Sequence, residues 1–233
     1  MSTGVSLPGS APLAIATAHG RLHGTLALPG QPVALVLLAH CSPAPGARHD
    51  ALAAALHHRQ VGTLTLDLLT SREERFADLH HDVSLLCRRL LDGLALLKQR
   101  MLLGELPTLP IGLFGAGDCS PVVLRVAALR DDDIFALVCH GGLIDLAGLI
   151  YLRTLAAPLL VLVGDEEPGI ETSNRRALAQ VSCVQELKVL PTRVDAHDSE
   201  PPAALLDNEN APSLIAVEAV RWFARHLPQT LRS

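Results

Sequence analysis

The sequence predicts a doubly wound α/β fold in a single domain, with a mostly parallel sheet that is covered by helices on both faces. Three observations predict it: short continuous apolar runs, helical segments that alternate with these runs, and no linker composition between the two halves. Continuous apolar runs of strand length are typical of strands buried on both faces of a parallel sheet. Their alternation with helices indicates such a sheet. We expect a tail over residues 1–11 and the domain over residues 12–230.

The predicted elements follow one another in a regular order. Apolar residues alternate with small or polar ones over residues 13–30, which predicts an N-terminal antiparallel hairpin. Apolar runs predict parallel strands over residues 33–39, 63–67, 109–115, 134–140, 158–164 and 185–190. Apolar residues at helical spacing or helix-forming composition predict helices over residues 50–60, 77–100, 121–130, 145–155, 172–181 and 213–227.

The composition excludes several classes of function. The chain has 233 residues, of which 49% are hydrophobic and only 3% aromatic, and its net charge is −5. Nucleic-acid binding usually needs a basic face, so we expect no nucleic-acid partner. No apolar run reaches the roughly 18 residues of a membrane span, and no basic segment precedes an apolar core at the start. Five cysteines without paired spacing argue against a disulfide framework, so we expect a cytoplasmic protein with reduced thiols.

Polar residues follow the predicted strands at the points where function is expected. In open α/β sheets, ligands bind outside the carboxyl ends of the strands. The residues at these ends are, in chain order, His40, Cys41 and Ser42, then Asp67, residues 117–120, residues 139–142, residues 165–167 and finally His197. We expect His40, Ser42, Asp67 and His140 to line a pocket for a small-molecule ligand or substrate.

Six landmarks in this order carry a resemblance to a known family. They are "LLAH" (37–40), "LDLLT" (66–70), "LPIGLFGA" (109–116), "GGLIDLAG" (141–148), "GDEEP" (164–168) and His197. With them the chain resembles the dienelactone-hydrolase-like branch of the α/β-hydrolase superfamily, from the first hairpin to the last helix. The resemblance implies an α/β-hydrolase fold and cofactor-free hydrolysis of an ester or lactone. It also implies that a nucleophile, an acid and a histidine follow one another along the chain.

The stretch "GLFGAGDCSP" departs from this family pattern where the nucleophile belongs. Family members present Ser or Cys on a sharp turn between a strand and a helix, flanked by small residues. In the natural register the nucleophile position falls on Gly117, which has no side chain to attack a substrate. Two neighbours are alternatives: Asp118 after a one-residue shift of the turn, and Cys119 after a two-residue shift. Ser120 is a weaker candidate, because it is expected to cap the following helix in front of Pro121.

The resemblance also implies the supporting groups. His197 takes the place of the catalytic histidine, although a solvated loop histidine is the alternative interpretation. Asp165 and Glu166 are equal candidates for the acid that orients it, and a solvated turn is again the alternative. The backbone N–H groups of Cys41 and Asp118 would form the oxyanion hole.

These observations lead to three hypotheses about function. The first is a pseudoenzyme, in which the Ser or Cys chemistry is lost and the pocket binds a small molecule or a partner. The second is an active hydrolase that uses Cys119 or Asp118 as nucleophile with His197 as base. The third is a metal protein, whose candidate ligands are His40, Cys41, Cys119, Cys139, His140 and His197.

The first hypothesis carries specific structural expectations. Gly117 should have a positive φ at the tip of the turn, and Cys119 should be a buried, slowly reacting thiol. An acidic neighbour such as Asp118 would also oppose ionisation of the Cys119 thiol. We expect no metal and no cofactor, because the histidines and cysteines lack the short spacing of metal ligands. Assembly with further copies of the chain is left open.

Overall fold

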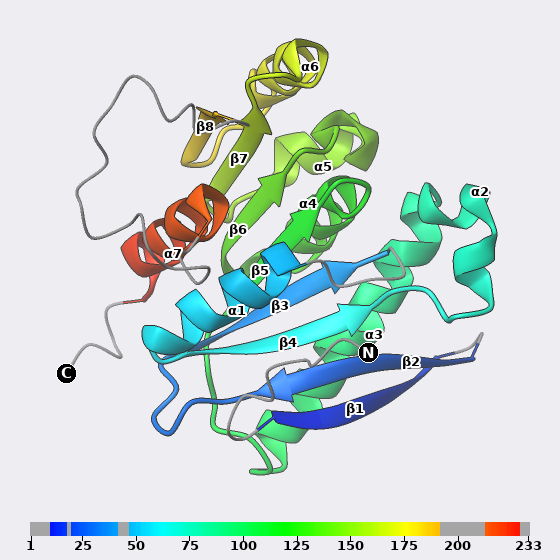
Figure 1. Cartoon of the computed structure of the whole chain (residues 1–233), viewed down its shortest axis with the longest axis vertical. Coiled ribbons are helices and arrows are strands. Elements are labelled where there is room, and N and C mark those ends of the chain that lie inside the picture. The colour runs from blue at the N-terminus through cyan, green and yellow to red at the C-terminus, as the bar shows by residue number, and fades with distance from the viewer. Residues whose placement is uncertain (1–9, 18–19, 42–46, 192–212, 229–233) are drawn as a thin grey trace.

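One eight-stranded sheet forms the centre of the protein (Figure 1). The computed structural model describes residues 10–17, 20–41, 47–191 and 213–228. The strands are β1 (Ser10–Thr17), β2 (Gly20–Ala27), β3 (Ala34–His40), β4 (Val61–Asp67), β5 (Ile111–Ala116), β6 (Ile134–His140), β7 (Leu159–Gly164) and β8 (Gln185–Leu190). The helices are α1 (Ala47–His58), α2 (Ala77–His80), α3 (Val83–Leu102), α4 (Cys119–Leu129), α5 (Leu149–Thr154), α6 (Pro168–Leu178) and α7 (Leu214–His226). Three short 3-10 helices are η1 (Glu73–Arg75), η2 (Asp131–Asp133) and η3 (Ile144–Ala147).

The strand order confirms the predicted fold class. The order across the sheet is β1-β2-β4-β3-β5-β6-β7-β8, and β1 and β2 form the predicted antiparallel hairpin. Strand β2 also runs antiparallel to β4, whereas every pair from β4 to β8 is parallel. The carboxyl ends of six strands therefore meet at one edge of the sheet, which is where the site is expected.

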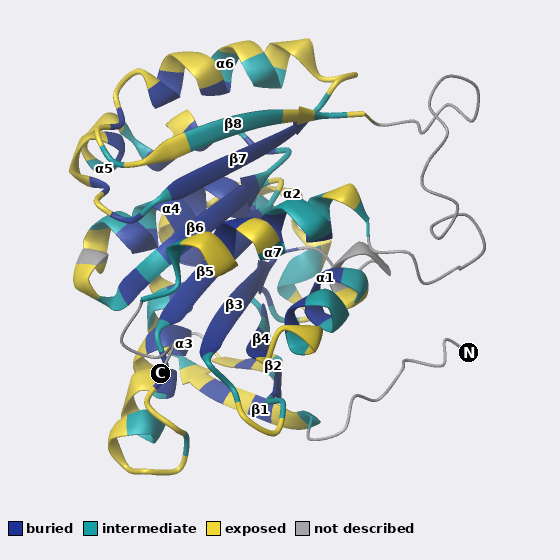
Figure 2. Ribbon diagram, turned by 90° about the vertical axis from the view of Figure 1, so that its left-hand side faces the viewer, coloured by how far each residue is buried: buried dark blue, intermediate teal, exposed yellow. Residues whose placement is uncertain are grey.

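Apolar side chains on the two faces of the sheet build two cores. The first core lies between the sheet and α3 to α6, and it includes the hairpin residues Leu13 and Ile15. The second lies between the sheet and the pair α1 and α7, where Trp222 and Phe223 are buried. Figure 2 shows the central strands buried along their length, whereas β8 at the sheet's edge is mostly half-buried. Burial on both faces explains why the central strands are continuous apolar runs in the sequence.

Two predicted helices are interrupted in the structure. The helix predicted over residues 77–100 is two helices, because Asp82 stands outside helical geometry and its side chain caps α3 by accepting a hydrogen bond from Leu85 N at 2.9 Å. The helix predicted over residues 145–155 breaks at Gly148, whose φ of +100° separates η3 from α5. None of the helices within the described ranges has the length and apolar character that crossing a membrane would require.

Candidate functional site

A sharp turn joins β5 to α4 and holds the predicted nucleophile position. Gly117 lies on this turn with a φ of +55°, which confirms the predicted backbone conformation. A Cβ on Gly115 would lie 2.6 Å from the carbonyl oxygen of Cys119, so the helix packs tightly on the end of β5. A Cβ on Gly117 would meet no atom within 4 Å. The turn therefore has open space on the side where a nucleophilic side chain would stand.

The two residues that follow Asp118 on this turn are both buried. Cys119 is fully buried, and its Sγ lies 3.0 Å from the Sγ of Cys41. The pKa of the Cys119 thiol is raised well above its ordinary value. The hydrogen bond to Cys41 is the larger cause and burial is the second. The prediction that Ser120 caps α4 is wrong, because the helix already begins at Cys119 and Asp118 occupies the N-cap position. The Ser120 hydroxyl instead donates to the carbonyl oxygens of Gly115 and His140, at 3.2 and 3.3 Å.

Asp118 contacts a histidine that the sequence did not single out for the site, and its charge also raises the pKa of the Cys119 thiol, as predicted. Its Oδ1 lies 3.1 Å from Nδ1 of His81, the residue that follows α2. The exposed fractions of the two side chains are 41% for Asp118 and 68% for His81, so this pair faces solvent. His81 carries no sequence signal for this site, because a His-His pair without metal-ligand spacing in a predicted helix is typical of an outward-facing residue.

The turn after β6 packs directly on the Gly117 turn. A Cβ on Gly142 would lie 2.1 Å from the carbonyl oxygen of Gly117, so only glycine fits there. Asn174 of α6, which is fully buried, holds this segment from behind. Its Nδ2 donates to Gly142 O at 2.8 Å, and its Oδ1 accepts from Ile144 N at 3.1 Å. Asn174 is a positioning residue that sequence reasoning missed, since one Asn in an amphipathic helix gives no signal.

The acidic turn after β7 approaches the same segment. Asp165 and Glu166, the two predicted orienting acids, are both exposed on this turn. The next residue, Glu167, was not predicted, yet its Oε2 lies 3.9 Å from the position of a Cβ on Gly141. Its carboxylate is therefore beside the turn that supports Gly117. The predicted histidine, His197, lies outside the described residues, as does Ser42.

The remaining predicted pocket residues end β3, β4 and β6. His40 is buried, and its carbonyl oxygen accepts from Leu68 N at 2.6 Å. Asp67 is partly buried, and its pKa is raised mainly by burial and further by the charge of Glu74. His140, which ends β6, is only partly buried.

Alternation along the strands divides the candidate metal ligands between the two faces of the sheet. Cys41, Cys119 and Cys139 belong to the core on the α3–α6 face. Neighbouring residues in a strand point to opposite faces, so His40 and His140 point towards the α1–α7 face. In the part of the chain that the structure describes, no group of three or more His, Cys, Asp or Glu side chains is arranged to hold a metal ion.

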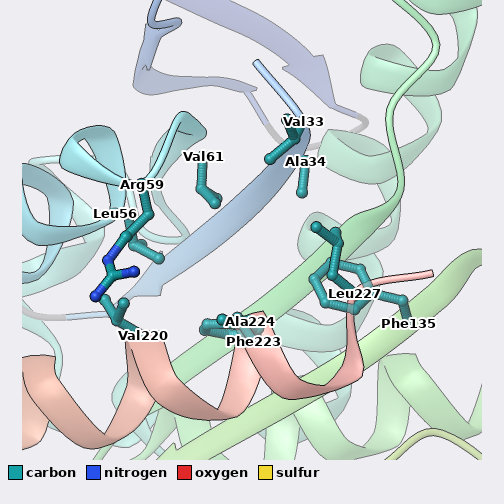
Figure 3. Close-up of a pocket in the computed structure, with 10 residues that line it drawn as sticks. All are labelled: Val33, Ala34, Leu56, Arg59, Val61, Phe135, Val220, Phe223, Ala224 and Leu227. Carbon is teal, nitrogen blue, oxygen red and sulfur yellow. The ribbon is translucent and has the colours of Figure 1, made fainter. Parts of the chain in front are cut away.

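A cavity of about 210 Å³ lies at the opposite, amino-terminal ends of the strands (Figure 3). Its lining comes from the starts of β3, β4 and β6 and from α1 and α7, and includes Val33, Phe135 and Phe223. It is smaller than the roughly 300–1,000 Å³ of typical ligand sites, and it lies away from the carboxyl ends where ligands bind in this fold class. Because ligands bind at the carboxyl ends of the strands in this fold class, the candidate site is the edge around Gly117.

Comparisons with known proteins agree with this architecture. The dienelactone hydrolase of Anabaena variabilis is 27% identical in sequence; the match covers 95% of this chain and 99% of that one, with a TM-score of 0.79. A cold-adapted esterase from an Arctic intertidal metagenomic library is 14% identical, with a TM-score of 0.68 over 94% of each chain, and shows the fold alone. No protein-family model matches the chain.

A longer relative is also similar in sequence. A protein of Mycobacterium tuberculosis that is provisionally named a phosphoribosyl transferase is 32% identical over 206 residues, which are 88% of this chain and 44% of that protein. The chain therefore spans less than half the length of this curated relative.

The strand order, the strand–turn–helix around Gly117 and these comparisons define an α/β-hydrolase fold. Within that superfamily the chain is similar in sequence and structure to the dienelactone-hydrolase-like branch.

Proposed function

We propose that this chain is an α/β-hydrolase-fold protein that binds a small molecule at the strand ends and lacks the Ser or Cys nucleophile of its relatives. The observation that carries the proposal is Gly117, which has a φ of +55° and open space where a nucleophile would stand. The site would then keep the shape of a hydrolase pocket without the group that forms the acyl-enzyme.

The residues beside Gly117 support this proposal, because neither neighbouring hydroxyl nor thiol is presented to a substrate. The Cys119 thiol is fully buried against Cys41, and its raised pKa disfavours the thiolate that would attack. The Ser120 hydroxyl is buried and engaged with backbone carbonyls. The backbone N–H groups of Cys41 and Asp118 remain the donors that we propose for a bound carbonyl oxygen.

The charges around the site favour neutral or cationic ligands. Asp118, Asp165, Glu166 and Glu167 lie on the turns that follow β5 and β7, and all four lie at the edge of the sheet where the pocket is proposed. A cluster of carboxylates repels anionic ligands and attracts cations. The name of the M. tuberculosis relative refers to a protein about twice as long, so we assign no transferase activity to this chain.

A second candidate function is an active hydrolase that uses Asp118. The specific observation in its favour is the 3.1 Å contact between Asp118 Oδ1 and His81 Nδ1. A carboxylate that holds one ring nitrogen of a histidine leaves the other nitrogen free to take a proton from water. In this alternative His81 would be the catalytic base, the role that the sequence analysis assigned to His197. If both histidines act, each would have a different partner.

A fluorophosphonate probe tests the proposal, since it forms a covalent bond with an activated serine. We expect no labelling of the parent and labelling of Gly117→Ser, because this substitution places a serine hydroxyl at the proposed nucleophile position. Gly117→Ala is the matched control, with the same backbone strain of about 1–2 kcal/mol from a left-handed residue and no hydroxyl. Labelling of the parent would show that an activated nucleophile is present and would overturn the proposal.

Hydrolysis assays separate the two candidate functions. Short acyl esters and lactones should not be hydrolysed by the parent, whereas neutral or cationic members of the same panel should raise its melting temperature. Hydrolysis that disappears both in Asp118→Asn and in His81→Ala would favour the second candidate. Hydrolysis that survives these changes but is lost in Cys119→Ala would favour the buried thiol instead.

A further inference from the structure

We propose that Cys41 and Cys119 form a reversible oxidation site, at which a peroxide-class oxidant joins the two thiols in an intramolecular disulfide. The two sulfur atoms are 3.0 Å apart, about 1 Å more than the length of a disulfide bond. The residues are 78 positions apart in the sequence, so only the fold brings them together. This proposal does not depend on the one above, because it requires neither a ligand nor a hydrolytic activity.

The backbone already holds the two cysteines beside each other. Cys41 follows β3 and Cys119 begins α4, directly after the turn that leaves β5. Strands β3 and β5 are hydrogen-bonded neighbours in parallel register, with Ala39 opposite Gly115. The bond would therefore join two side chains that the fold already places in contact.

The other three cysteines have different neighbours. The Cys139 thiol donates to the carbonyl oxygen of Ser120 at 3.4 Å, and the Cys183 thiol donates to that of Ala157 at 3.2 Å. Cys87 is buried on α3. All five cysteines lie in the described ranges, and within those ranges the contact between Cys41 and Cys119 is the single hydrogen bond between two thiols.

The exposure of the two thiols sets the order of the chemical steps. Cys41 is 8% exposed and Cys119 is fully buried, so the oxidant reaches Cys41 first. The Cys41 sulfur attacks one peroxide oxygen, the O–O bond breaks, and Cys41 sulfenic acid and water form. The Cys119 sulfur then attacks the Cys41 sulfur, the S–O bond breaks, and a second water leaves with the Cys119 proton. The two thiols lose two electrons and two protons, and hydrogen peroxide is reduced to two waters.

The position of this pair connects oxidation to the candidate site. Cys41 directly follows β3, and Cys119 starts the helix immediately after Gly117 and Asp118. A disulfide would tie the two segments that supply the proposed oxyanion-hole donors. The contact also protects Cys41, since a nearby thiol captures sulfenic acid before a second oxidant converts it irreversibly.

The test is treatment of the whole protein with hydrogen peroxide, followed by unfolding in urea, alkylation of the remaining thiols and mass spectrometry. We expect the parent to lose the mass of two hydrogen atoms, to keep three alkylatable cysteines and to yield one linked peptide pair that contains Cys41 and Cys119. Dithiothreitol should restore all five thiols. The linked peptides are read in the parent itself, so this result does not depend on the stability of any variant.

Matched variants complete the test. Cys183→Ala removes a more exposed thiol and should leave the mass loss unchanged, whereas Cys41→Ala and Cys119→Ala should abolish it. Trp222 fluorescence confirms that each variant is folded. Sulfinic acid on Cys41 in the parent, a link to another cysteine, a link between two molecules, or five unmodified thiols after treatment that oxidises a reference dithiol would each overturn the proposal.

Discussion

At the scale of single residues, three glycines have different structural roles in and around the turn between β5 and α4. Gly117 supplies a left-handed backbone conformation and leaves open space beside it. Gly115 and Gly142 allow close backbone packing, because a side chain at either position would collide with the backbone of this turn. In the proposed function, Gly117 is the position without a nucleophile, whereas Gly115 and Gly142 allow the close packing that holds the turn in place.

Gly142→Ala should lower the free energy of unfolding by about 1–3 kcal/mol, the usual cost of overpacking a filled region. Its added Cβ would stand 2.1 Å from Gly117 O and 2.7 Å from the Ser120 side chain. The control is Gly169→Ala in α6, where a Cβ meets nothing within 4 Å and helix propensity predicts a gain of up to about 1 kcal/mol. Urea unfolding measures both. Equal effects of the two substitutions would contradict the close packing at Gly142.

The sequence predicts the residues of the turn around Gly117 but not the distant residues that contact them. The register that put Gly117 at the nucleophile position came from the strand and the small residues before it, which are local signals. The contacts of Cys119 with Cys41, of Asp118 with His81 and of Asn174 with Gly142 join distant parts of the chain. A pattern along one sequence does not show which loops meet at a sheet edge, so these partners required the structure.

At the scale of elements, a buried ion pair fastens the segment after β4 to α3. Arg89 of α3 is only 2% exposed, and its guanidinium donates to both carboxylate oxygens of Glu73, at 2.9 and 2.6 Å. The same side chain donates to Leu68 O at 2.8 Å. The hydrogen bonds that Glu73 accepts, first those from Arg89 and then those from Thr70, hold its pKa down to about 2, from an ordinary value of 4.5.

Glu73→Gln should destabilise the protein by about 2–3 kcal/mol at neutral pH, because it leaves the buried Arg89 charge without a counterion. The folded pKa lies below the unfolded one, so this stabilisation is complete above about pH 4.5 and disappears as the pH falls towards 2. Urea unfolding of parent and variant between pH 7 and pH 3 should show the gap closing. Glu105→Gln, which breaks the exposed contact with Arg100, is the control and should change stability by less than about 1 kcal/mol. A gap that stays constant with pH would contradict this account.

The elements themselves were largely predictable, and the differences have local causes. Every predicted strand and helix is present, because burial on both faces leaves apolar runs and amphipathic helices leave a clear period. The errors concern boundaries. Asp82 starts a new helix where a continuous one was predicted, and Gly148 interrupts another. Capping and a positive φ depend on the conformation of single residues, which hydrophobic periodicity does not report.

For the whole molecule, the sheet is shared by two cores that different helices cover. The α1–α7 face holds Phe223, which is 2% exposed and lies edge-on to Phe135 with ring centroids 5.9 Å apart. The α3–α6 face holds Cys87 of α3. Strands β3, β5, β6 and β7 contribute side chains to both cores. Loss of one core would therefore expose one face of each of these strands.

Phe223→Ala should lower the free energy of unfolding by about 3–5 kcal/mol, as expected for loss of a buried aromatic side chain. The control, Phe76→Ala, removes the same side chain from a position that is 57% exposed and should cost less than about 0.5 kcal/mol. The difference in free energy between these two variants measures burial rather than residue type. Similar losses in both variants would contradict the packing of α7 on the sheet.

The shared sheet further predicts that both faces unfold in one step, which tests the single domain proposed for residues 12–230. Trp222, the one tryptophan of the chain, reports on the α1–α7 face by its fluorescence, and alkylation of the buried Cys87 reports on the opposite face. In urea the two probes should give the same midpoint in the parent, and Phe223→Ala should shift both midpoints equally although Cys87 lies across the sheet. If Trp222 becomes exposed at a urea concentration that leaves Cys87 protected, α1 and α7 form a separately unfolding layer. The strands would then be held by the α3–α6 core alone.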